Sequence, residues 1–412
     1  MRGFLQSIDL REVEGEYSPM LEASRVIREI DAPCLLKVRG WDGGVWKVAS
    51  NIFSSRELLC SALGCTKENL IKRLMGGGDG SVKVVKDSPT LEFEKDANLR
   101  ELPILQHFRE DGGPYITGGV LFSEYGGVQN ASVHRIQMLD AKRGVVRLVA
   151  PRHTYLLHSK AVENGDELPV ALAIGVEPVV LLSACTRVEL GMELMYASSL
   201  KGEPIEVFEC SNGVKVPHAE FVLEGYISSE REREGPFVDI TGTYDRVRHE
   251  PVIYFERMYH RSDPIYHAIM PSSPEHKVLM GIPYEPIIYR AVSEVADVVN
   301  VVMSVGGCCY LHAIVQIRKK TEGDGKNAAL AALGAHGSLK HVVVVDEDID
   351  VFDINDVEYA IATRVQADRD VFIVKGARGS SLDPSSVDGT STKVGIDATK
   401  KNNLDAYKRV KE

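Results

Sequence analysis

The sequence predicts an α/β (α+β) protein with an N-terminal α/β domain, a β-rich central domain and a C-terminal α/β domain. Residues 1–100 mix helical and strand patterns. From about residue 116 to 253 the chain is a succession of short apolar runs broken by Gly and Pro, which is typical of a β-barrel or a β-sandwich. Beyond about residue 273, helices and strands alternate again. We expect the following segments: 1–100, 101–272, 273–390 and a tail over 391–412.

Local patterns predict the elements of the first two parts. Near the N-terminus, amphipathic spacing predicts helices over 17–30 and 54–63, and an apolar run predicts a strand over 34–38. In the centre, strands are expected over 132–138, 144–149, 170–174, 205–210 and 220–227. Residues 187–200 keep apolar side chains at helical spacing, and this helix would place Glu189 and Glu193 on one face.

The C-terminal part alternates between the two patterns. Helices are expected over 284–304 and 326–333, and strands over 310–317 and 341–346, with at least partly parallel pairing. The acidic run 346–350 follows a buried strand directly, where loops of open α/β sheets often carry an active site. This run is either a solvated turn between a strand and a helix or a metal site.

Composition and charge limit the class of protein. The 412 residues are 44% hydrophobic and 26% charged, as in an ordinary soluble protein, and the net charge of −11 argues against a nonspecific nucleic-acid binder. The seven cysteines form no CxxC pair, which indicates reduced thiols in the cytoplasm. The N-terminus lacks the apolar segment of a signal peptide, and Glu177 and Pro178 interrupt the best apolar run, so neither targeting nor stable membrane insertion is expected.

Residues 234–242 place two carboxylates, Glu234 and Asp239, five residues apart on a segment that cannot be helical. Pro236 fixes its own φ and pushes Gly235 out of the α region. Two carboxylates on such a turn can share a proton or bracket a substrate. The alternative is a solvated loop between two strands.

Other polar side chains of the centre have the character of ligands. Asn130, His153 and Glu193 combine oxygen donors with one imidazole, a set that suits Mn²⁺ or Mg²⁺ better than Zn²⁺. Alternatively, His153 is a structural histidine and Asn130 caps a turn. Arg135 lies in a strand-like stretch, on the same face as Val133, and a charge there needs an anionic substrate or a carboxylate as its partner.

A series of motifs follows in a fixed order along the central and C-terminal parts of the chain. The central motifs are Asn130-x4-Arg135, Pro151-Arg-His153, Pro169-Val-Ala-Leu-Ala-Ile-Gly175-Val-Glu-Pro178, Glu193 nine residues before Gly202, Val216-Pro-His-Ala-Glu-Phe-Val-Leu-Glu-Gly225, and Glu234-Gly-Pro-Phe. The C-terminal motifs are Val343-Val-Val-Asp-Glu-Asp-Ile-Asp350, Ala360-Ile-Ala-Thr-Arg364 and Lys393-Val-Gly-Ile-Asp-Ala-Thr399. This ordered series resembles the UbiD-type decarboxylases, which use prenylated FMN. The resemblance covers nearly the whole chain and is weakest before residue 100.

The resemblance implies a fold, a cofactor and a site. The central domain would be a split β-barrel of flavin-reductase type, and the C-terminal domain would assemble a homodimer or a homohexamer. Asn130, His153 and Glu193 would hold a divalent metal, usually Mn²⁺, against the cofactor phosphate, with K⁺ as a further ion. The remaining cofactor contacts would come from Arg135, Arg152, Ser183 and the C-terminal Lys393. A UbiX-type flavin prenyltransferase would supply the cofactor.

The catalytic residues implied by the resemblance are Arg135, Glu234 and Asp239. Much of the family has Glu at the position of Asp239, and the shorter side chain withdraws the carboxyl group by about 1.5 Å. Loss of CO₂ from an α,β-unsaturated acid would leave a vinylic carbanion, so an electron sink and an acid are needed. We assign Asp239 as the proton donor, directly or through water, and Glu234 as the residue that poises Arg135.

The expected function is non-oxidative decarboxylation of an α,β-unsaturated acid. The expected substrate is trans-anhydromevalonate 5-phosphate, converted to isopentenyl phosphate in isoprenoid synthesis by the mevalonate pathway. An aromatic acid, such as a polyprenyl-hydroxybenzoate or a cinnamic-type acid, is the alternative substrate. A non-catalytic flavin-binding protein is the alternative of another class.

Overall fold

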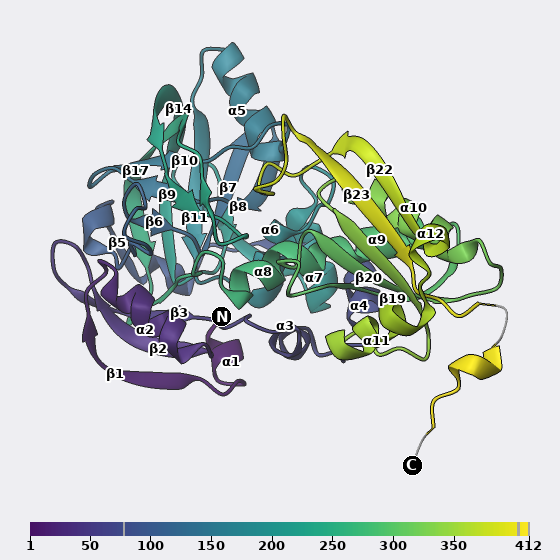
Figure 1. Ribbon diagram of the computed structural model, residues 1–412. Coiled ribbons are helices and arrows are strands. Elements are labelled where there is room, and N and C mark those ends of the chain that lie inside the picture. Colours follow the sequence, from purple (N-terminus) through teal and green to yellow (C-terminus); the bar gives the residue numbers. More distant parts are fainter. Residues whose placement is uncertain (77–78, 402–403, 411–412) are drawn as a thin grey trace. The chain divides into compact units, whose positions relative to one another are not determined.

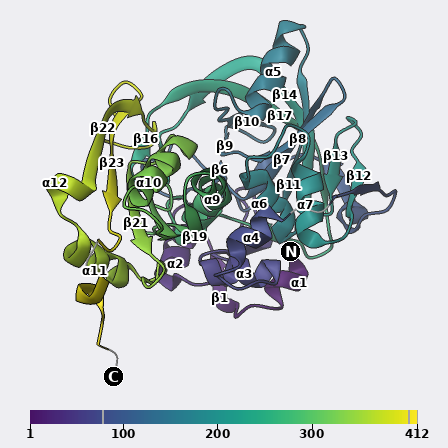
Figure 2. The same ribbon diagram turned by 90° about the vertical axis from the view of Figure 1, so that its right-hand side faces the viewer.

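The computed structural model describes residues 1–76, 79–401 and 404–410, and the chain divides into two compact units. The first unit comprises Met1–Thr66 and Gly76–His276, and the second comprises Lys67–Met75 and Lys277–Glu412. Figures 1 and 2 show both units as mixed helix and sheet. The α/β (α+β) fold class expected from the sequence is confirmed.

The N-terminal segment forms a four-stranded sheet in the order β1-β2-β3-β18. Its strands are β1 Arg11–Tyr17, β2 Cys34–Arg39, β3 Val45–Ser50 and β18 Ile265–His267. Its helices are α1 Arg2–Leu5, α2 Glu22–Ile30 and α3 Arg56–Leu63. The strand expected over 34–38 and the helix over 54–63 are confirmed. The helix expected over 17–30 is shorter, because Tyr17 ends β1 and Pro19 disfavours helical backbone at the residue before it.

A nine-stranded antiparallel sheet forms the centre of the first unit. Its path is β6-β9-β10-β17-β14-β11-β7-β8, with β5 paired to β17, and no pairing joins β6 to β8 among the described residues. The strands are β5 Phe93–Asp96, β6 Tyr115–Ile116, β7 Gly119–Tyr125, β8 Val128–Val133, β9 Ile136–Met138, β10 Arg143–Val146, β11 Leu168–Ile174, β14 Phe221–Glu234 and β17 Arg248–His260. This arrangement is compatible with the expected split barrel.

One hydrophobic core serves the N-terminal elements and the central sheet. Ile27 of α2 and Leu36 of β2 belong to the same buried cluster as Leu121, Leu172 and Phe221 of the central strands. Burying this apolar surface is the main favourable contribution to folding. The two segments are therefore one cooperative body, on which the polar residues of the site are mounted.

Three helices and two small sheets complete the first unit. The helices are α5 His153–Glu163, α6 Pro178–Cys185 and α7 Glu193–Lys201; α5 packs on β7 and β11, and α6 packs on α7 and β8. The small sheets contain β4 Val82–Val84, β12 Ile205–Glu209 and β13 Lys215–Pro217, and β15 Phe237–Val238 and β16 Tyr244–Asp245. The 3-10 helices are η1 Pro89–Glu92 and η2 Leu99–Glu101.

Two expectations for the centre are wrong. The strand over 132–138 is two strands, because β8 pairs with β7 whereas β9 pairs with β6 and β10, and His134 and Arg135 lie at the break between them. The helix over 187–200 begins only at Glu193, after Gly191 at φ +87°, so Glu189 does not share a helical face with Glu193.

The second unit is a five-stranded sheet in the order β19-β20-β21-β23-β22, with β20, β21 and β23 parallel. Its strands are β19 Asp297–Met303, β20 His312–Arg318, β21 His341–Asp346, β22 Val371–Arg378 and β23 Thr390–Asp397. The remaining helices of the chain are α4 Leu70–Met75, α8 Pro274–Gly281, η3 Ile282–Tyr284, α9 Glu285–Ser293, α10 Asp324–Ala335, α11 Ile354–Arg364, α12 Ala367–Asp370 and η4 Leu404–Tyr407. The partly parallel pairing is confirmed.

Helices cover both faces of this sheet (Figure 1). Val343 and Val345 pack with Val357 and Ala360 of α11, and α10 contacts β20, β21 and β23. The helix expected over 284–304 is wrong, since α9 ends at Ser293 and the Val-rich segment that follows is β19. β-Branched residues fit a paired strand better than a helix, and β20 supplies the partner.

The acidic run after β21 is held by basic side chains. Arg364 of α11 donates to Asp346 and Asp348, and Lys400 lies 2.8 Å from Asp348. In the described part of the chain, no group of three His, Cys, Asp or Glu side chains forms a metal site. The run is therefore a turn with paired charges. The tail expected over 391–412 begins inside β23, and its residues 402–403 and 411–412 lie outside the described residues.

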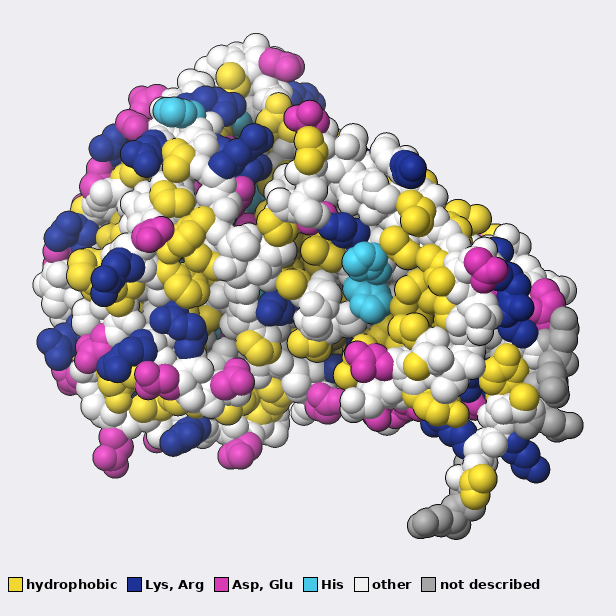
Figure 3. Space-filling model, viewed as in Figure 1, with side chains coloured by type: hydrophobic (Ala, Val, Ile, Leu, Met, Phe, Trp, Pro, Cys, Tyr) yellow, Lys and Arg dark blue, Asp and Glu magenta, His cyan; other side chains and the backbone are white. Residues whose placement is uncertain are grey.

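The exposed side chains of the chain carry both signs of charge. On the face shown in Figure 3, Lys and Arg side chains alternate with Asp and Glu side chains rather than forming one basic stripe. Among the described helices, none has the length and apolar character needed to cross a membrane.

Candidate active site

Arg135 is the centre of a buried ionic cluster at the break between β8 and β9. Its Nε and Nη2 donate to the two carboxylate oxygens of Glu234 at 3.0 and 2.9 Å, and its Nη1 donates to Asp239 at 2.9 Å. The Arg135 side chain is 10% exposed. The structure thus brings together the three residues assigned to catalysis.

Glu234 lies behind the guanidinium, away from solvent. It is the last residue of β14, its side chain is 0% exposed, and the Tyr115 hydroxyl donates to its Oε1 at 3.0 Å. The side-chain carbonyl of Gln137 accepts from the Gly235 amide at 2.9 Å, and this bond fixes the end of the strand. Both carboxylate oxygens of Glu234 are therefore committed to holding Arg135 in place.

Asp239 is the accessible carboxylate of the loop. It follows β15, and the Gly242 amide closes a tight turn by donating to its backbone carbonyl at 2.8 Å. Its Oδ1 accepts from the Ile240 amide at 2.7 Å, its Oδ2 faces Arg135, and its side chain is 15% exposed. The shorter Asp side chain therefore still reaches the guanidinium. A turn with one open carboxylate agrees with the acid/base interpretation of the loop.

Asp245 is a third carboxylate of the cluster, which the sequence did not single out. It accepts from Arg135 Nη2 at 2.9 Å and from Arg248 Nη1 at 2.5 Å. Burial by itself would raise the pKa of Asp245, but the Arg248 hydrogen bond and the Arg135 charge lower it. Burial likewise opposes the charge of Arg135, yet the surrounding carboxylates, Glu234 first, raise the pKa of Arg135. Arg135 is therefore a permanent cation.

The base of the loop rests on residues 107–113. The Gly112 amide donates to the Pro236 carbonyl at 2.8 Å, and a Cβ on Gly112 would lie 2.4 Å from the Gly235 carbonyl oxygen, so only glycine fits there. Asp111 accepts from the amides of His107 and Phe108 at 3.2 and 2.8 Å. Burial raises the pKa of this carboxyl to about 6.

The three residues expected to hold a metal lie along one polar chain. His153, the first residue of α5, places Nδ1 3.2 Å from Oε1 of Glu193, the first residue of α7. Asn130 of β8 donates to the Thr154 hydroxyl at 2.9 Å, next to His153. Ser183 of α6 donates to the Glu193 carbonyl. The first residues of α5 and α7 are thus in direct contact, and Asn130 of β8 is linked to them through Thr154, the neighbour of His153.

This donor set fits a divalent cation. Glu193 is 4% exposed, and burial raises the pKa of its carboxyl despite the neighbouring imidazole of His153. A buried carboxylate with an imidazole and an amide is a suitable ligand set for Mn²⁺ or Mg²⁺, and a cation would offset the cost of burying the charge. No third His or carboxylate joins the group among the described residues, so the set depends on the amide oxygen of Asn130.

Arg152 and Lys393, the other two residues expected to contact the cofactor, belong to different units of the chain. Arg152 is the exposed N-cap residue of α5, directly before His153. Lys393 belongs to β23 of the second unit, where its Nζ donates to the Gly337 carbonyl at 2.8 Å and burial lowers its pKa. The position of Lys393 within its own sheet is thus defined.

Sequence reasoning missed a group of neutral polar residues beside the expected metal ligands. The Ser132 and Thr154 hydroxyls lie 2.7 Å apart, and His134 Nε2 lies 2.8 Å from Ser132 and 3.0 Å from Thr154. Burial lowers the pKa of His134 to about 4, so this imidazole is neutral. The available signal was the alternation of Asn130, Ser132 and His134 at every second position along the chain.

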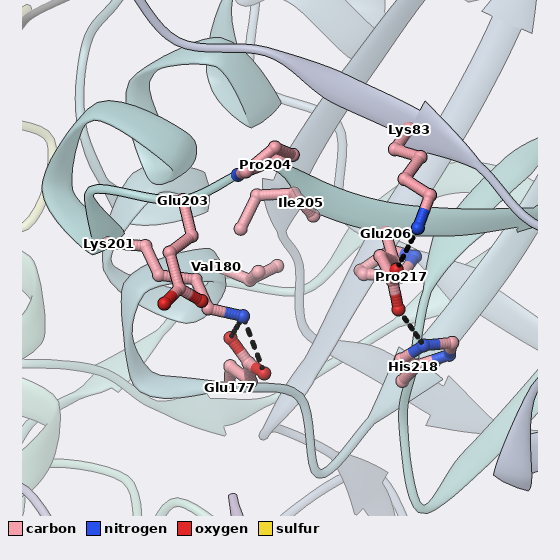
Figure 4. Close-up of a pocket in the computed structure, with 10 residues that line it drawn as sticks. All are labelled: Lys83, Glu177, Val180, Lys201, Glu203, Pro204, Ile205, Glu206, Pro217 and His218. Atoms are coloured by element: carbon pink, nitrogen blue, oxygen red, sulfur yellow. Dashed lines mark hydrogen bonds and ion pairs between the residues drawn. The ribbon is translucent and has the colours of Figure 1, made fainter.

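A surface hollow of about 400 Å³ lies elsewhere, between α6, α7 and the small sheet of β12 (Figure 4). Most of its ionisable side chains are paired with one another: Lys201 lies 2.9 Å from Glu177, and Glu206 lies 2.7 Å from Lys83 and 3.4 Å from His218. None of the residues expected in the site lines this hollow. The ionic cluster, rather than the hollow, is the candidate for chemistry.

Three family models match the chain in order. They are the N-terminal domain of 3-octaprenyl-4-hydroxybenzoate carboxy-lyase over residues 6–76, its Rift-related domain over 82–274 and its C-terminal domain over 277–398. The chain therefore belongs to the UbiD family of carboxy-lyases, as its motifs indicated.

Individual relatives within this family carry the name of one particular activity. The anhydromevalonate phosphate decarboxylase of Methanosarcina mazei is 57% identical over 396 residues, which span 95% of this chain and 93% of the relative. The enzyme of the same name from Archaeoglobus fulgidus is 49% identical, over 92% of this chain and 88% of the relative. Among solved structures, the UbiD-class enzyme HmfF from Pelotomaculum thermopropionicum in complex with FMN is 38% identical, with a TM-score of 0.95 and coverage of 100% of this chain and 97% of that one.

Proposed function

We propose that this protein is a prenylated-FMN-dependent decarboxylase that converts trans-anhydromevalonate 5-phosphate to isopentenyl phosphate and CO₂. The observation that carries the proposal is the cluster of Arg135, Glu234 and Asp239, which places one cation and one accessible carboxyl group side by side. Relatives that carry the name of this activity support the choice of substrate. An evolved dimeric form of HmfF in complex with prFMN, 35% identical with a TM-score of 0.91, supports the choice of cofactor.

The first task of the protein is to hold the substrate carboxylate. Arg135 carries a positive charge and is 10% exposed, so it can donate to a carboxylate that reaches it. Glu234 fixes the guanidinium with two hydrogen bonds and stays out of contact with the substrate, because it is fully buried. When bound, prenylated FMN supplies the electron sink that loss of CO₂ from a vinylic carbon requires.

The second task is to deliver a proton. Decarboxylation converts a carboxylate and one proton into CO₂ and a C–H bond, so each turnover consumes one proton. Asp239 is the accessible carboxyl group beside Arg135, and we assign it as the donor, directly or through one water molecule. Its exposure also lets solvent return the proton after each turnover.

The proposal includes the sites and partners expected from the sequence. Asn130, His153 and Glu193 would hold Mn²⁺ or Mg²⁺ near the phosphate of the cofactor, with Arg152, Ser183 and Lys393 as further contacts and K⁺ as a further ion. A UbiX-type prenyltransferase would supply the cofactor, and the chain would assemble as a homodimer or a homohexamer in the cytoplasm. Seven free cysteines are consistent with a reducing compartment.

A reconstituted holoenzyme tests the proposal. Protein produced with a flavin prenyltransferase should release CO₂ from anhydromevalonate phosphate and form isopentenyl phosphate in equal amounts, while the same protein without flavin should be inactive. Vanillic and 3,4-dihydroxybenzoic acids complete the panel, because structural relatives that act on these acids are 25–27% identical. Turnover of an aryl acid with none of the phosphate substrate would reverse the substrate assignment, and activity of flavin-free protein would refute the mechanism.

A further inference from the structure

The hydrogen bonds of Arg135 leave one donor open. A guanidinium has five N–H groups. Two of them, on Nε and Nη2, bind Glu234, the second N–H of Nη2 binds Asp245, and one N–H of Nη1 binds Asp239. Among the described residues, no acceptor binds the fifth N–H. This open donor lies on Nη1, the nitrogen that also binds Asp239.

A single hairpin supplies both outer carboxylates. Strands β15 and β16 pair antiparallel with Phe237 opposite Asp245, and Asp239 lies in the turn between them. The Phe237 ring lies 4.8 Å from the guanidinium carbon of Arg135, a distance suited to a cation–π contact. The hairpin therefore contacts Arg135 through a ring and two carboxylates, which leaves the guanidinium little freedom to rotate.

Asp245 binds Arg135 without adding net charge, because Arg248 neutralises it. Its side chain is 7% exposed, Oδ1 accepts from the Arg246 amide at 2.9 Å, and Oδ2 is shared by Arg135 and Arg248. Without Asp245, the guanidinium groups of Arg135 and Arg248 would face each other in a partly desolvated environment, where like charges repel more strongly than in water.

Asp239 is the least hydrogen-bonded of the three carboxylates that bind Arg135. The cluster contains three arginines and four carboxylates, which leaves one excess negative charge when all are ionised: Arg135, Arg147, Arg248, Glu234, Asp239, Asp245 and Glu250. Glu234 and Asp245 each accept from three donors, whereas Asp239 accepts from Arg135 and one backbone amide. Asp239 is therefore the carboxylate bound to Arg135 that is most open to a further hydrogen bond, and at 15% its side chain is also the most exposed of the three.

We infer that Asp245, paired with Arg248, is a positioning residue for the decarboxylation: it occupies Nη2 of Arg135 and leaves one N–H, beside Asp239, for the substrate carboxylate. This inference rests on the proposed function. The substrate carboxylate is then held by one hydrogen bond on the nitrogen that also binds the proton donor. Loss of CO₂ and delivery of the proton therefore occur at one point of the site.

Substitution of each partner tests the inference. Asp245→Ala should lower kcat/KM about tenfold to a hundredfold, because a small misplacement of a catalytic group costs this much. Asp245→Asn, which keeps the shape and an acceptor, should recover part of the loss. Asp42→Asn is the matched control, since Asp42 forms an Asp–Arg pair with Arg100 on the surface and lies outside the cluster. Circular dichroism of each variant establishes that it is folded.

A pH profile separates a positioning role from a merely structural one. Asp245→Asn removes a negative charge near Asp239, so the alkaline limb of kcat should move to lower pH, whereas Arg248→Gln removes a positive charge and should move it to higher pH. The groups that face Arg135 from the neighbouring elements are Glu234, Asp239 and Tyr115, with Arg147 and Glu250 beyond them, and none of these changes in either variant.

Binding provides a readout that does not depend on turnover. Mevalonate 5-phosphate, the hydrated form of the substrate, has no double bond to react, and calorimetry with the holoenzyme should show weaker binding to Asp245→Ala than to wild type. Unchanged kcat/KM, binding and pH profile in an active enzyme would overturn the inference alone. A wild-type holoenzyme that turns over no acid of the panel would overturn the proposed function, and the inference with it.

Discussion

Replacing Arg135 by lysine keeps the charge at the centre of the site but removes the planar donor group. The wild-type guanidinium donates four hydrogen bonds to three carboxylates, one of which is fully buried. An ammonium group has three donors and cannot bind Glu234 through two parallel bonds while it also reaches Asp239 and Asp245. At least one buried carboxylate oxygen is therefore left without its partner.

The size of the effect follows from this count. Removing one partner of a buried ion pair costs about 3–5 kcal/mol, and because the substituted lysine would retain the charge, we expect a loss of about 2–3 kcal/mol in the free energy of unfolding. Loss of the carboxylate-binding geometry should lower kcat/KM by about 10³-fold, of the order seen when a preorganised donor is removed. Urea denaturation of the flavin-free protein and the decarboxylation assay measure the two quantities.

The control for this prediction is Arg100→Lys, which changes a surface arginine paired with Asp42. It should leave stability within about 0.5 kcal/mol and activity unchanged, because exposed ion pairs contribute little. If Arg135→Lys behaves like this control in both assays, Arg135 neither organises the cluster nor binds the substrate, and the proposed site is wrong.

Two further predictions concern pH and metal. Burial raises the pKa of Asp111 from 3.8 to about 6, so the folded state holds this proton more tightly than the unfolded state. Relative to Asp111→Asn, wild-type stability should therefore be greatest below about pH 4 and fall by up to about 3 kcal/mol as pH rises through 6. Urea midpoints of the two proteins that differ by a constant amount from pH 4 to 8 would contradict this prediction. Glu193→Gln, or removal of divalent metal with a chelator, should weaken flavin retention about tenfold to a hundredfold, measured by the flavin absorbance that remains after gel filtration. The control variant Glu203→Gln, which changes an exposed residue, should retain wild-type flavin content. Equal flavin retention in the two variants would show that Glu193 is not a metal ligand.

Much of the fold could be predicted because the strands carry their own pattern. The run 341–346 is buried on both faces of a parallel strand and reads as continuous apolar sequence, so β21 was found at its correct bounds. The segment 284–304 could not be resolved in this way, since apolar residues at helical spacing continue into β19. Its Val-rich end becomes a strand because β20 pairs with it, and that partner is not visible in local sequence.

The site shows the same division between local and distant information. The turn after Glu234 was predictable from Pro236 and its glycines, and the motifs brought Arg135 to the same place. Asp245 was not found, because its role depends on the pairing of β15 with β16, which returns the chain to Arg135 after the turn. The break at Arg135 was also missed, since it arises from β8 and β9 choosing different partners rather than from any residue that disfavours a strand.

The most direct test of the account is the decarboxylation rate of the Asp239→Asn holoenzyme with anhydromevalonate phosphate. The substituted asparagine would keep the size of the side chain and an acceptor for Arg135 but carry no acidic proton, so flavin should remain bound at the wild-type level while turnover falls by at least about 10²-fold. A variant that retains both flavin and wild-type turnover would contradict the assignment of Asp239 as proton donor and, with it, the proposed mechanism.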